Sequence, residues 1–315
     1  MIAIIRAFAL LCVGVLPALA QTWAPPPASA RCPSKWGAAD ERGAANYMTP
    51  ENILRATQLI KTGELIELGR VLSSDMPLFG TRRFDMYLKR TSPSAGTNQR
   101  RGNEEIITTE LGQVGTQFDM FPHQMIGSET YNCNVVDDIA TRSGFSKLGV
   151  EKVGMLYTRG VLIDVAGAKG VETLPINYEI TVDDLQTALQ REGISIHSGD
   201  AVLMHTGWGK LWGVDNAKYN SGCPGIGAPA AEWLAKQDVM LLGADNWPVE
   251  VGPNPDKTIS LPVHQIALVV NGIFLLENMK LDELAAKKVY EFAFMVQPLK
   301  IKGGTGSTVA PVAIH

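Results

Sequence analysis

The segment from Leu111 to His123 constrains this chain more than any other. It reads Leu-Gly-Gln-Val-Gly-Thr-Gln-Phe-Asp-Met-Phe-Pro-His, and its polar side chains stand at intervals of four, two and four, at Gln113, Gln117, Asp119 and His123. Polar residues at even spacing project to one side of an extended segment. A strand here would aim two amides, a carboxylate and an imidazole the same way, as a divalent metal requires. A half-buried strand with a polar face is the alternative that this segment alone leaves open.

Composition limits the classes of function. The chain has 315 residues, 45% of them hydrophobic and 19% charged, with a net charge of −4. It is therefore long enough to bury a sizeable core, and it has no basic patch for nucleic acid. Glycine-rich loops with nucleotide-binding spacing, a G-x-S-x-G elbow and the HExxH pattern are all missing from the sequence. What remains is a metal site assembled from distant segments.

The first twenty residues resemble a secretory signal. Arg6 provides a positive charge, residues 7–16 form a short apolar run, and Ala18-Leu19-Ala20 matches the small-x-small cleavage pattern. We expect cleavage after Ala20 and export, to the periplasm in a Gram-negative host, with no membrane association afterwards. An uncleaved N-terminal anchor is the alternative. Residues 21–35, rich in Pro, Ala and Ser, are expected to form an extended arm before a domain spanning 36–315.

Three cysteines remain after the signal, at Cys32, Cys133 and Cys223, with no CxxC spacing. They allow at most one disulfide and one odd thiol, so stability must come from a packed core.

Strand and helix signals are mixed along the rest of the chain, which predicts a single α/β domain. Residues 75–103 show no periodicity and are expected to be a long irregular excursion. A central strand is expected over 105–119. The other expected strands cover 65–72, 155–164, 200–204, 239–244, 273–276 and 289–299, and the expected helices cover 50–61, 181–192, 228–236 and 262–270.

Two polar residues stand in strongly apolar surroundings near the C-terminus. His264 follows Leu-Pro-Val, and Glu277 lies in Leu-Leu-Glu-Asn. A Glu at the end of a buried strand is costly unless it is paired or bound to a cation, so both residues are candidates to complete a site opened by Asp119 and His123. A salt-bridged structural Glu277 is an open alternative. His205, at another strand end, is interpreted as a satisfied structural histidine.

Together these segments resemble the putative cyclase family, which includes bacterial kynurenine formamidases and isatin hydrolase. The family hallmark is H-x-G-T-H-x-D-x-P-x-H, and this chain has Gln113-Val-Gly-Thr-Gln-Phe-Asp-Met-Phe-Pro-His123 in register. The likeness spans roughly residues 36 to 308. The other matching segments are Trp36-Gly-Ala-Ala-Asp-Glu-Arg-Gly-Ala-Ala-Asn46, Gly199-Asp-Ala-Val-Leu-Met-His-Thr-Gly-Trp208, Gly243-Ala-Asp-Asn-Trp247, Pro262-Val-His264 and Leu276-Glu277-Asn278.

The resemblance implies a swivelling β/β/α-type fold, a homo-oligomer and a divalent metal site. Carried over by position, one set of metal ligands is Gln113, Gln117 and Asp119, and a second set, which also serves the catalytic step, is His123, His264 and Glu277.

The chain departs from the hallmark because both first-site histidines are Gln and the Pro is shifted to Pro122. An amide oxygen is a harder and weaker donor than imidazole, which favours manganese, magnesium or calcium over zinc, or an empty first site. The second set is intact and resembles a two-His, one-carboxylate zinc site.

The leading hypothesis is metal-assisted hydrolysis of a small amide, imide or lactone, with His123 and Glu277 as catalytic residues. Two alternatives stay open: a secreted binding protein on an inactive scaffold, and a metal-dependent lyase or cyclase. The expected cofactor is zinc or manganese, and the expected partner is a small-molecule substrate. Four aromatic residues are candidates for the pocket wall, namely Phe118, Phe121, Trp208 and Trp247.

Overall fold

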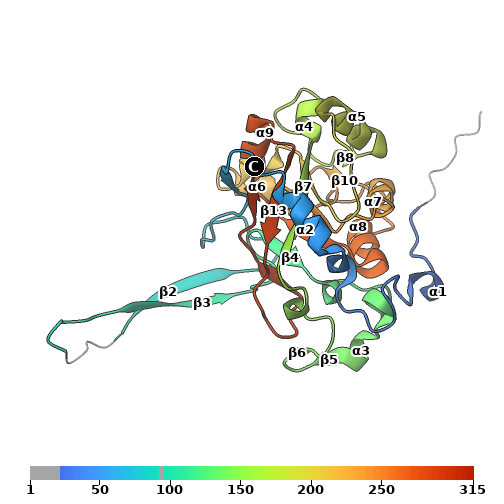
Figure 1. The fold of residues 1–315 in the computed structure, drawn as a ribbon. Coiled ribbons are helices and arrows are strands. Elements are labelled where there is room, and N and C mark those ends of the chain that lie inside the picture. The colour runs from blue at the N-terminus through green and yellow to red at the C-terminus, as the bar shows by residue number, and fades with distance from the viewer. Residues whose placement is uncertain (1–21, 92–95) are drawn as a thin grey trace, which may run out of the picture.

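A nine-stranded mixed sheet forms the centre of the computed structural model, which describes residues 22–91 and 96–315 (Figure 1). The predicted signal at residues 1–20 lies outside the described residues. In spatial order the strands are β1 (Leu65–Glu67), β15 (Val312–Ile314), β13 (Glu291–Val296), β7 (Leu156–Asp164), β9 (Ala201–His205), β11 (Leu241–Ala244), β12 (Phe274–Glu277), β4 (Gln117–Asp119) and β14 (Gly306–Thr308).

Four neighbouring strands, β7, β9, β11 and β12, run parallel, and the strands on either side of them pair antiparallel. The residues of β9, β11 and β12 are all buried, because elements cover both faces of this part of the sheet. Each of the four strands ends at or just before a polar residue, so polar side chains collect along one edge of the sheet: Asp164, His205, Asp245 and Glu277.

The helices follow the capping signals in the sequence. Thr181 and Asp184 form a capping box at the start of α5 (Val182–Glu192), which ends at Gly193 in the left-handed conformation. Helix α2 (Pro50–Thr57) packs against β7 and β13, while α5 packs against β7 and α7 (Ala228–Ala235). The remaining described helices and helical turns are α1 (Ala28–Arg31), α3 (Val136–Ile139), α4 (Val165–Ala168), α6 (Asn216–Asn220), α8 (Pro262–His264), α9 (Asp282–Lys287), the π-helix η6 (Gln265–Asn271) and the 3-10 turns η1 (Gly43–Tyr47), η2 (Phe121–His123), η3 (Tyr131–Cys133), η4 (Val150–Lys152) and η5 (Trp208–Leu211). None of the described helices is long and apolar enough to cross a membrane.

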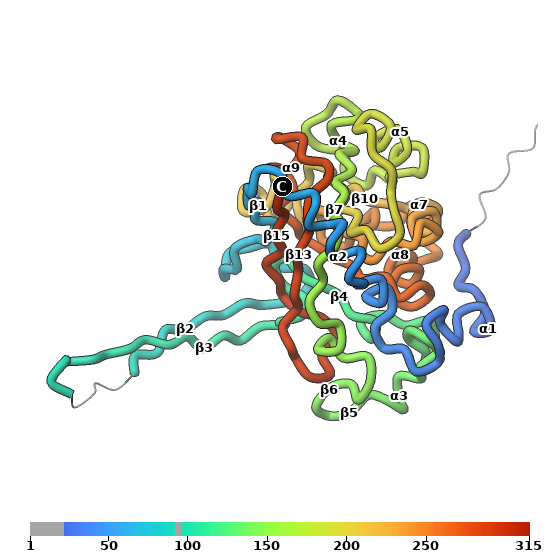
Figure 2. The backbone as a smooth tube through the Cα atoms, in the orientation of Figure 1, coloured from blue at the N-terminus to red at the C-terminus, as the bar shows by residue number. Residues whose placement is uncertain are grey.

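The predicted α/β single domain is confirmed, but the region from 75 to 119 differs from expectation. Residues expected to be irregular contain β2 (Phe84–Arg90), which pairs with β3 (Asn103–Thr109) to form a long hairpin that projects from the body (Figure 2). The single strand expected over 105–119 is instead two strands, β3 and β4, separated by a turn at Gly115, whose φ is +64°. The sequence does not predict the hairpin, because neither of its faces packs on the core and its residues therefore show no strand-like alternation of apolar and polar side chains. Two short pairs complete the strands, β8 (Glu179–Ile180) with β10 (Gly225–Ile226) and β5 (Ala140–Thr141) with β6 (Gly144–Phe145).

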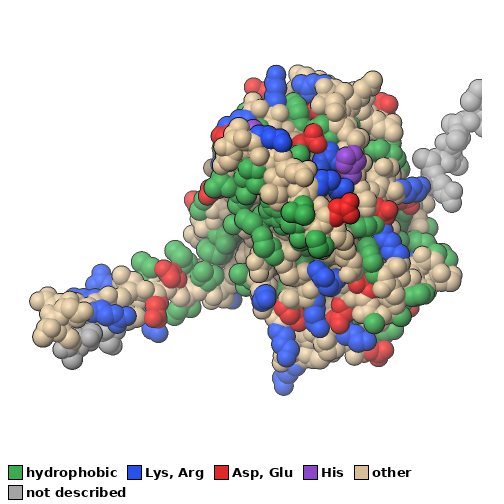
Figure 3. Space-filling model, viewed as in Figure 1, with side chains coloured by type: hydrophobic (Ala, Val, Ile, Leu, Met, Phe, Trp, Pro, Cys, Tyr) green, Lys and Arg blue, Asp and Glu red, His purple; other side chains and the backbone are tan. Residues whose placement is uncertain are grey.

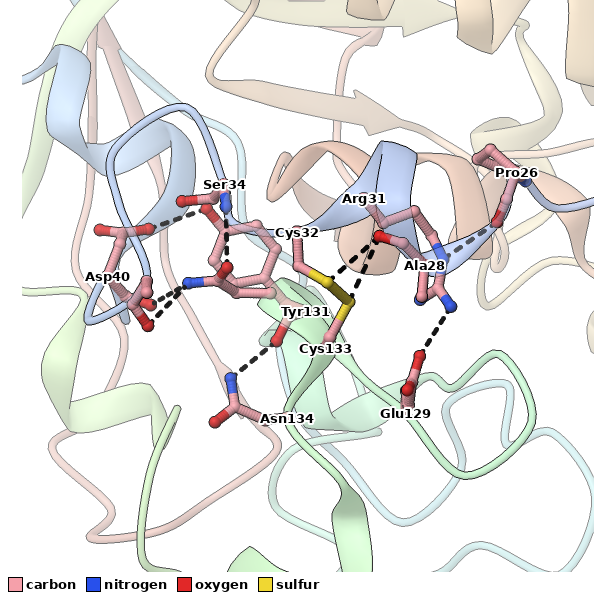
Figure 4. Close-up of a disulfide and its surroundings, with 12 residues drawn as sticks. Pro26, Ala28, Arg31, Cys32, Ser34, Asp40, Glu129, Tyr131, Cys133 and Asn134 are labelled. Carbon is pink, nitrogen blue, oxygen red and sulfur yellow. Dashed lines mark hydrogen bonds and ion pairs between the residues drawn. A yellow bond between two sulfur atoms is a disulfide. The ribbon is translucent and has the colours of Figure 1, made fainter.

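The N-terminal arm is anchored rather than free. A disulfide joins Cys32, just after α1, to Cys133 in η3, and Arg31 forms an ion pair of 2.7 Å with Glu129 beside it (Figure 4). Cys223 is a buried free thiol. One disulfide and one odd thiol is the count that the cysteine content allowed.

Candidate metal centre

The site lies where β12 and β4 meet. These strands are antiparallel, and Glu277 at the end of β12 is directly opposite Gln117 at the start of β4. The chain continues from β4 into η2, which carries His123, while α8 brings in His264. The expected residues therefore converge, but from four elements and not from one extended segment.

Three side chains form a grouping that fits a metal ion. One ligand atom each from Asp119, His123 and His264 lie within 4.8 Å of one another. The Oδ2 atom of Asp119 is 3.9 Å from Nε2 of His123 and 3.8 Å from Nε2 of His264. Glu277 lies beside them, with Oε1 3.2 Å from Nε2 of His264.

The Oδ2 atom of Asp119 supports a cation most directly. Asp119 is fully buried, and this oxygen has no hydrogen-bond partner among the residues that the structure describes. A buried carboxylate oxygen without a partner is costly, and a bound cation removes that cost. With two imidazoles and a second carboxylate around it, the donor set suits zinc or another divalent transition ion.

Glu250 orients His264, and it was not among the residues predicted for the site. Its Oε1 lies 2.6 Å from Nδ1 of His264, and its carboxylate also accepts the backbone N–H groups of Val263 and His264. A carboxylate on Nδ1 fixes the ring so that Nε2 faces the site, as in carboxylate–histidine–metal groupings. Glu250 is fully buried. The only signal for it was a charged residue in the apolar run around Pro248 and Val251.

The two glutamines form a chain of amides across the site. Gln113 Nε2 donates to Oδ1 of Asp119 at 3.1 Å and lies 3.2 Å from Nδ1 of His123. Gln117 Nε2 donates to Oε2 of Glu277 at 2.5 Å and lies 3.2 Å from Oε1 of Gln113. The amide N–H groups thus face the carboxylates. The two glutamines therefore position Asp119 and Glu277 by donating hydrogen bonds to them.

Burial and charge shift the pKa values in the cluster. Burial and the charge of Asp119 raise the pKa of Glu277 to about 8. Burial alone would lower the pKa of His264, but the carboxylates of Glu250 and Glu277 raise it well above its ordinary value. Burial lowers the pKa of His123. Without a metal, protons held by His264 and Glu277 thus balance the negative charge of the carboxylates. A bound cation would displace these protons.

A cavity of about 150 Å³ opens onto this cluster. Trp247 lines it and stacks on Phe79 with ring centroids 4.2 Å apart, and Arg82 also lines it. The structure places only one of the four expected aromatic residues, Trp247, along the cavity. The other three are fully or almost fully buried and pack in the core because they face other aromatic or apolar side chains: Phe118 on Phe274, Phe121 on Tyr131 and Phe274, and Trp208 with Tyr219 and Cys223.

His205 belongs to a separate cluster. Its Nδ1 lies 2.7 Å from Oδ1 of Asp164, and its Nε2 lies 3.6 Å from Asp282 and 4.0 Å from Asp245. Burial alone would lower its pKa, but these carboxylates raise it to about 10. The geometry agrees with a structural, ion-paired histidine.

Several known proteins are similar to this chain in sequence and fold. The profile described as "Putative cyclase" matches residues 66–251. Isatin hydrolase from Roseibium aggregatum is 26% identical over 205 residues, covering 64% of this chain and 70% of its own. A solved structure described as a novel cyclase is 32% identical, with a TM-score of 0.81, and covers 90% of this chain and 98% of its own. Isatin hydrolase A from Ralstonia solanacearum is 26% identical, with a TM-score of 0.58 and coverage of 85% and 99%. The relatives include hydrolases, and the residues of the site suit metal-dependent chemistry; this chain belongs to the putative cyclase family.

Proposed function

We propose that this protein is an exported metal-dependent hydrolase that opens a small cyclic amide, imide or lactone. The observation that carries the proposal is the unpartnered Oδ2 of Asp119, buried between two imidazole Nε2 atoms beside an aromatic-walled cavity. Asp119, His123 and His264 would hold the ion, with Glu277 beside them. A divalent ion supplies Lewis acidity, which polarises a carbonyl group and makes water a nucleophile at neutral pH.

Residues of the chain account for the movement of protons. Glu277 lines the cavity, and its Oε1 is free of the Gln117 amide, which binds Oε2. We assign it as the base that takes a proton from the attacking water. The hydroxyl group joins the carbonyl carbon as the C–N or C–O bond breaks, and the proton passes to the leaving atom. His123, whose side chain is 20% exposed, also lines the cavity and would complete the ligand set next to the substrate.

The wall of the cavity favours a planar substrate. The stacked rings of Phe79 and Trp247 offer a flat apolar surface, and the guanidinium of Arg82 supplies the positive charge in the lining. Ring opening of an imide or lactone produces a carboxylate, which Arg82 can pair with. The names of the two isatin hydrolases among the relatives fit an aromatic cyclic amide of this kind.

One specific observation supports a second candidate. The amides of Gln113 and Gln117 already bond to Asp119 and Glu277, as expected of a scaffold that has lost one metal. A secreted binding protein without catalysis would use the same cavity. A lyase or cyclising activity on the same metal centre is a third possibility, which product mass distinguishes from hydrolysis.

The test is an assay of aromatic imides, lactams, formyl amides and lactones with protein loaded with Zn²⁺ or Mn²⁺. We expect turnover of at least one class, with a product heavier than the substrate by one water. Folded, metal-loaded protein that binds panel members but turns none over would instead support the binding protein. A product that has lost water would support the cyclising reaction.

Export is a separate part of the proposal. It is supported by the signal-like pattern before Gln21 and by the Cys32–Cys133 disulfide, since disulfides persist in oxidising compartments. Expression of the full chain in a Gram-negative host should yield periplasmic protein whose N-terminal sequence begins at Gln21. Recovery of the uncleaved chain in the membrane fraction would favour the anchor.

A further inference from the structure

The cavity beside the metal ligands is small. Its volume is about 150 Å³. An apolar cavity of about 150 Å³ holds one benzene ring, whereas pockets for small-molecule ligands usually measure roughly 300–1,000 Å³. A substrate larger than a single ring therefore has to extend beyond this cavity, and the walls of the cavity indicate the direction.

A second pocket begins where the cavity ends. It has a volume of about 340 Å³ and shares Phe79, Trp247 and Leu261 with the lining of the cavity. All of its other lining residues come from the segment 251–260, which connects Glu250 to the turn before His264. This second space is called the outer pocket below. Added together, the two volumes fall within the range of ligand pockets.

Trp247 stands in a fixed position between the cavity and the outer pocket. Its indole ring stacks on Phe79, and its edge packs against Gly252, where a Cβ atom would lie only 2.9 Å from Cζ2 of the indole. Glycine at position 252 therefore lets the ring lie directly against the backbone. A substituent on a ring bound in the cavity can follow the Trp247 and Phe79 rings into the outer pocket.

The lining of the outer pocket suits an apolar group with a negative charge at its end. Val251, Pro253 and Ile259 supply aliphatic surface beside the two aromatic rings, and Lys257 is the only charged residue of the lining. Lys257 forms no ion pair with any described residue, and its Nζ atom donates to the backbone oxygen of Asn254 at 3.2 Å. Its charge is therefore available to a ligand.

This single charge matters because the protein as a whole does not attract anions. The net charge is −4, and positive and negative side chains are interspersed over the face of the body seen in Figure 3. The neighbouring carboxylate of Asp256 lies outside the lining and accepts hydrogen bonds from the backbone and hydroxyl of Thr258. Recognition of an anionic group in the outer pocket therefore depends on Lys257.

We propose that the outer pocket is a substrate subsite, which binds an apolar substituent with an anionic end on the ring that the metal centre opens. The inference rests on the proposed function and makes the substrate class more specific. The ring occupies the cavity beside Asp119, and the substituent passes Trp247 and reaches Lys257. Specificity for the substituent then lies in the segment 251–260, which contains none of the metal ligands.

The test uses three probes that differ only in the group on one ring carbon: succinimide, phenylsuccinimide and para-carboxyphenylsuccinimide. Calorimetry with protein loaded with Zn²⁺ or Mn²⁺ gives the dissociation constants, and KM is measured for each probe that turns over. The phenyl group should tighten binding by about tenfold, because burial of a Phe-sized group is worth at least that factor. The carboxylate should add roughly two- to fivefold, as in other exposed ion pairs.

Two variants locate the bound substituent. Lys257→Glu should abolish the gain from the carboxylate and leave the affinities for succinimide and phenylsuccinimide unchanged. Ile259→Ser should reduce the gain from the phenyl group by about threefold, because it removes apolar surface. The matched control is Lys300→Glu, which makes the same charge change at an exposed lysine outside both linings and should bind all three probes as the wild type does.

The outcomes separate the subsite from the proposed function. Equal affinity of the wild type for the three probes, or no binding of any of them, would overturn the subsite. A Lys257→Glu variant that keeps the gain from the carboxylate, or that weakens all three probes equally, would also overturn it. A gain in affinity in protein that hydrolyses no amide, imide or lactone would support the subsite and contradict the hydrolase. Turnover of succinimide without any gain from the substituents would support the hydrolase and overturn the subsite.

Discussion

Two buried histidine–carboxylate clusters lie along the same edge of the sheet, and they differ in what surrounds them. One holds His264 and Asp119 near the end of β12, and the other holds His205 and Asp245 near the ends of β9 and β11. In the second, Oδ1 of Asp245 accepts from the backbone and hydroxyl of Thr206, and Oδ2 accepts from Gly209 N. In the first, Oδ2 of Asp119 accepts no hydrogen bond from the described part of the chain.

The difference shows that residue type alone does not make a site. Both clusters pair an imidazole with several carboxylates, but the unpartnered atoms of the His205 cluster, its Nε2 and Oδ1 of Asp282, form an ion pair with each other at 3.6 Å. In the His264 cluster, which lines a cavity, Oδ2 of Asp119 has no hydrogen-bond partner among the described residues. The carboxylates around His205 stabilise its charged ring and connect the ends of β7 and β11 with helix α9. A buried carboxylate oxygen that lies beside two imidazole nitrogens and has no hydrogen-bond partner is suited to bind a cation.

His264→Ala should have the largest effect. Loss of a direct ligand should weaken metal binding by more than roughly a hundredfold, because even partners outside the ligand shell are worth about 10- to 100-fold. Elemental analysis and calorimetry would measure this, with hydrolysis lost in parallel. Full metal content in the folded variant would refute the assignment of the site.

His205→Gln should act on stability and leave metal content unchanged. Breaking a buried ion pair costs about 3 kcal/mol of unfolding free energy. The folded pKa of His205 is about 10, above its ordinary 6.5, so the ion pair stabilises fully below pH 6.5, and this stabilisation is lost as the pH rises through 10. Urea unfolding at pH 6 and pH 10 should therefore show a larger difference from wild type at pH 6. Loss of metal from this variant would contradict the separation of the two clusters, because it would show that His205 also supports metal binding.

Glu250→Gln tests the carboxylate behind His264. The amide retains the volume but not the charge, so Nδ1 is held less firmly, and metal affinity should fall by roughly ten- to a hundredfold. Competition with a chelator would measure the change. Asp245→Asn serves as the matched control in the other cluster and should leave metal affinity as in wild type.

The double substitution Gln113→His and Gln117→His should have the smallest effect on the existing centre. It restores the hallmark pattern, and we expect metal content to rise from one ion to two per chain. If the wild-type protein already holds two ions, the amides are ligands and not substitutes for a metal. If the variant still holds one, positions 113 and 117 no longer define a first site.

Much of the fold could be predicted from local signals. The start of α2 and both ends of α5 follow their capping residues, whereas α2 ends at Thr57 and not at the expected residue 61. The buried parallel strands follow their apolar runs. The hairpin could not be predicted, because its side chains face solvent and no core imposes a period on them. The prediction that Phe118, Phe121 and Trp208 line the cavity was wrong for a different reason. The sequence identifies large aromatic residues but not whether their side chains point to the cavity or to the core.

The sequence by itself determined the family, the α/β class and the set of side chains able to bind a metal, since these depend on residue type and order. Only the tertiary structure decided which of them act together. It joined Glu277 to Gln117 by strand pairing, placed Glu250 behind His264, and separated His205 from the cavity. The physical reason is that a polar atom's role depends on whether its hydrogen bonds are already made, and the partners that make them come from distant parts of the chain.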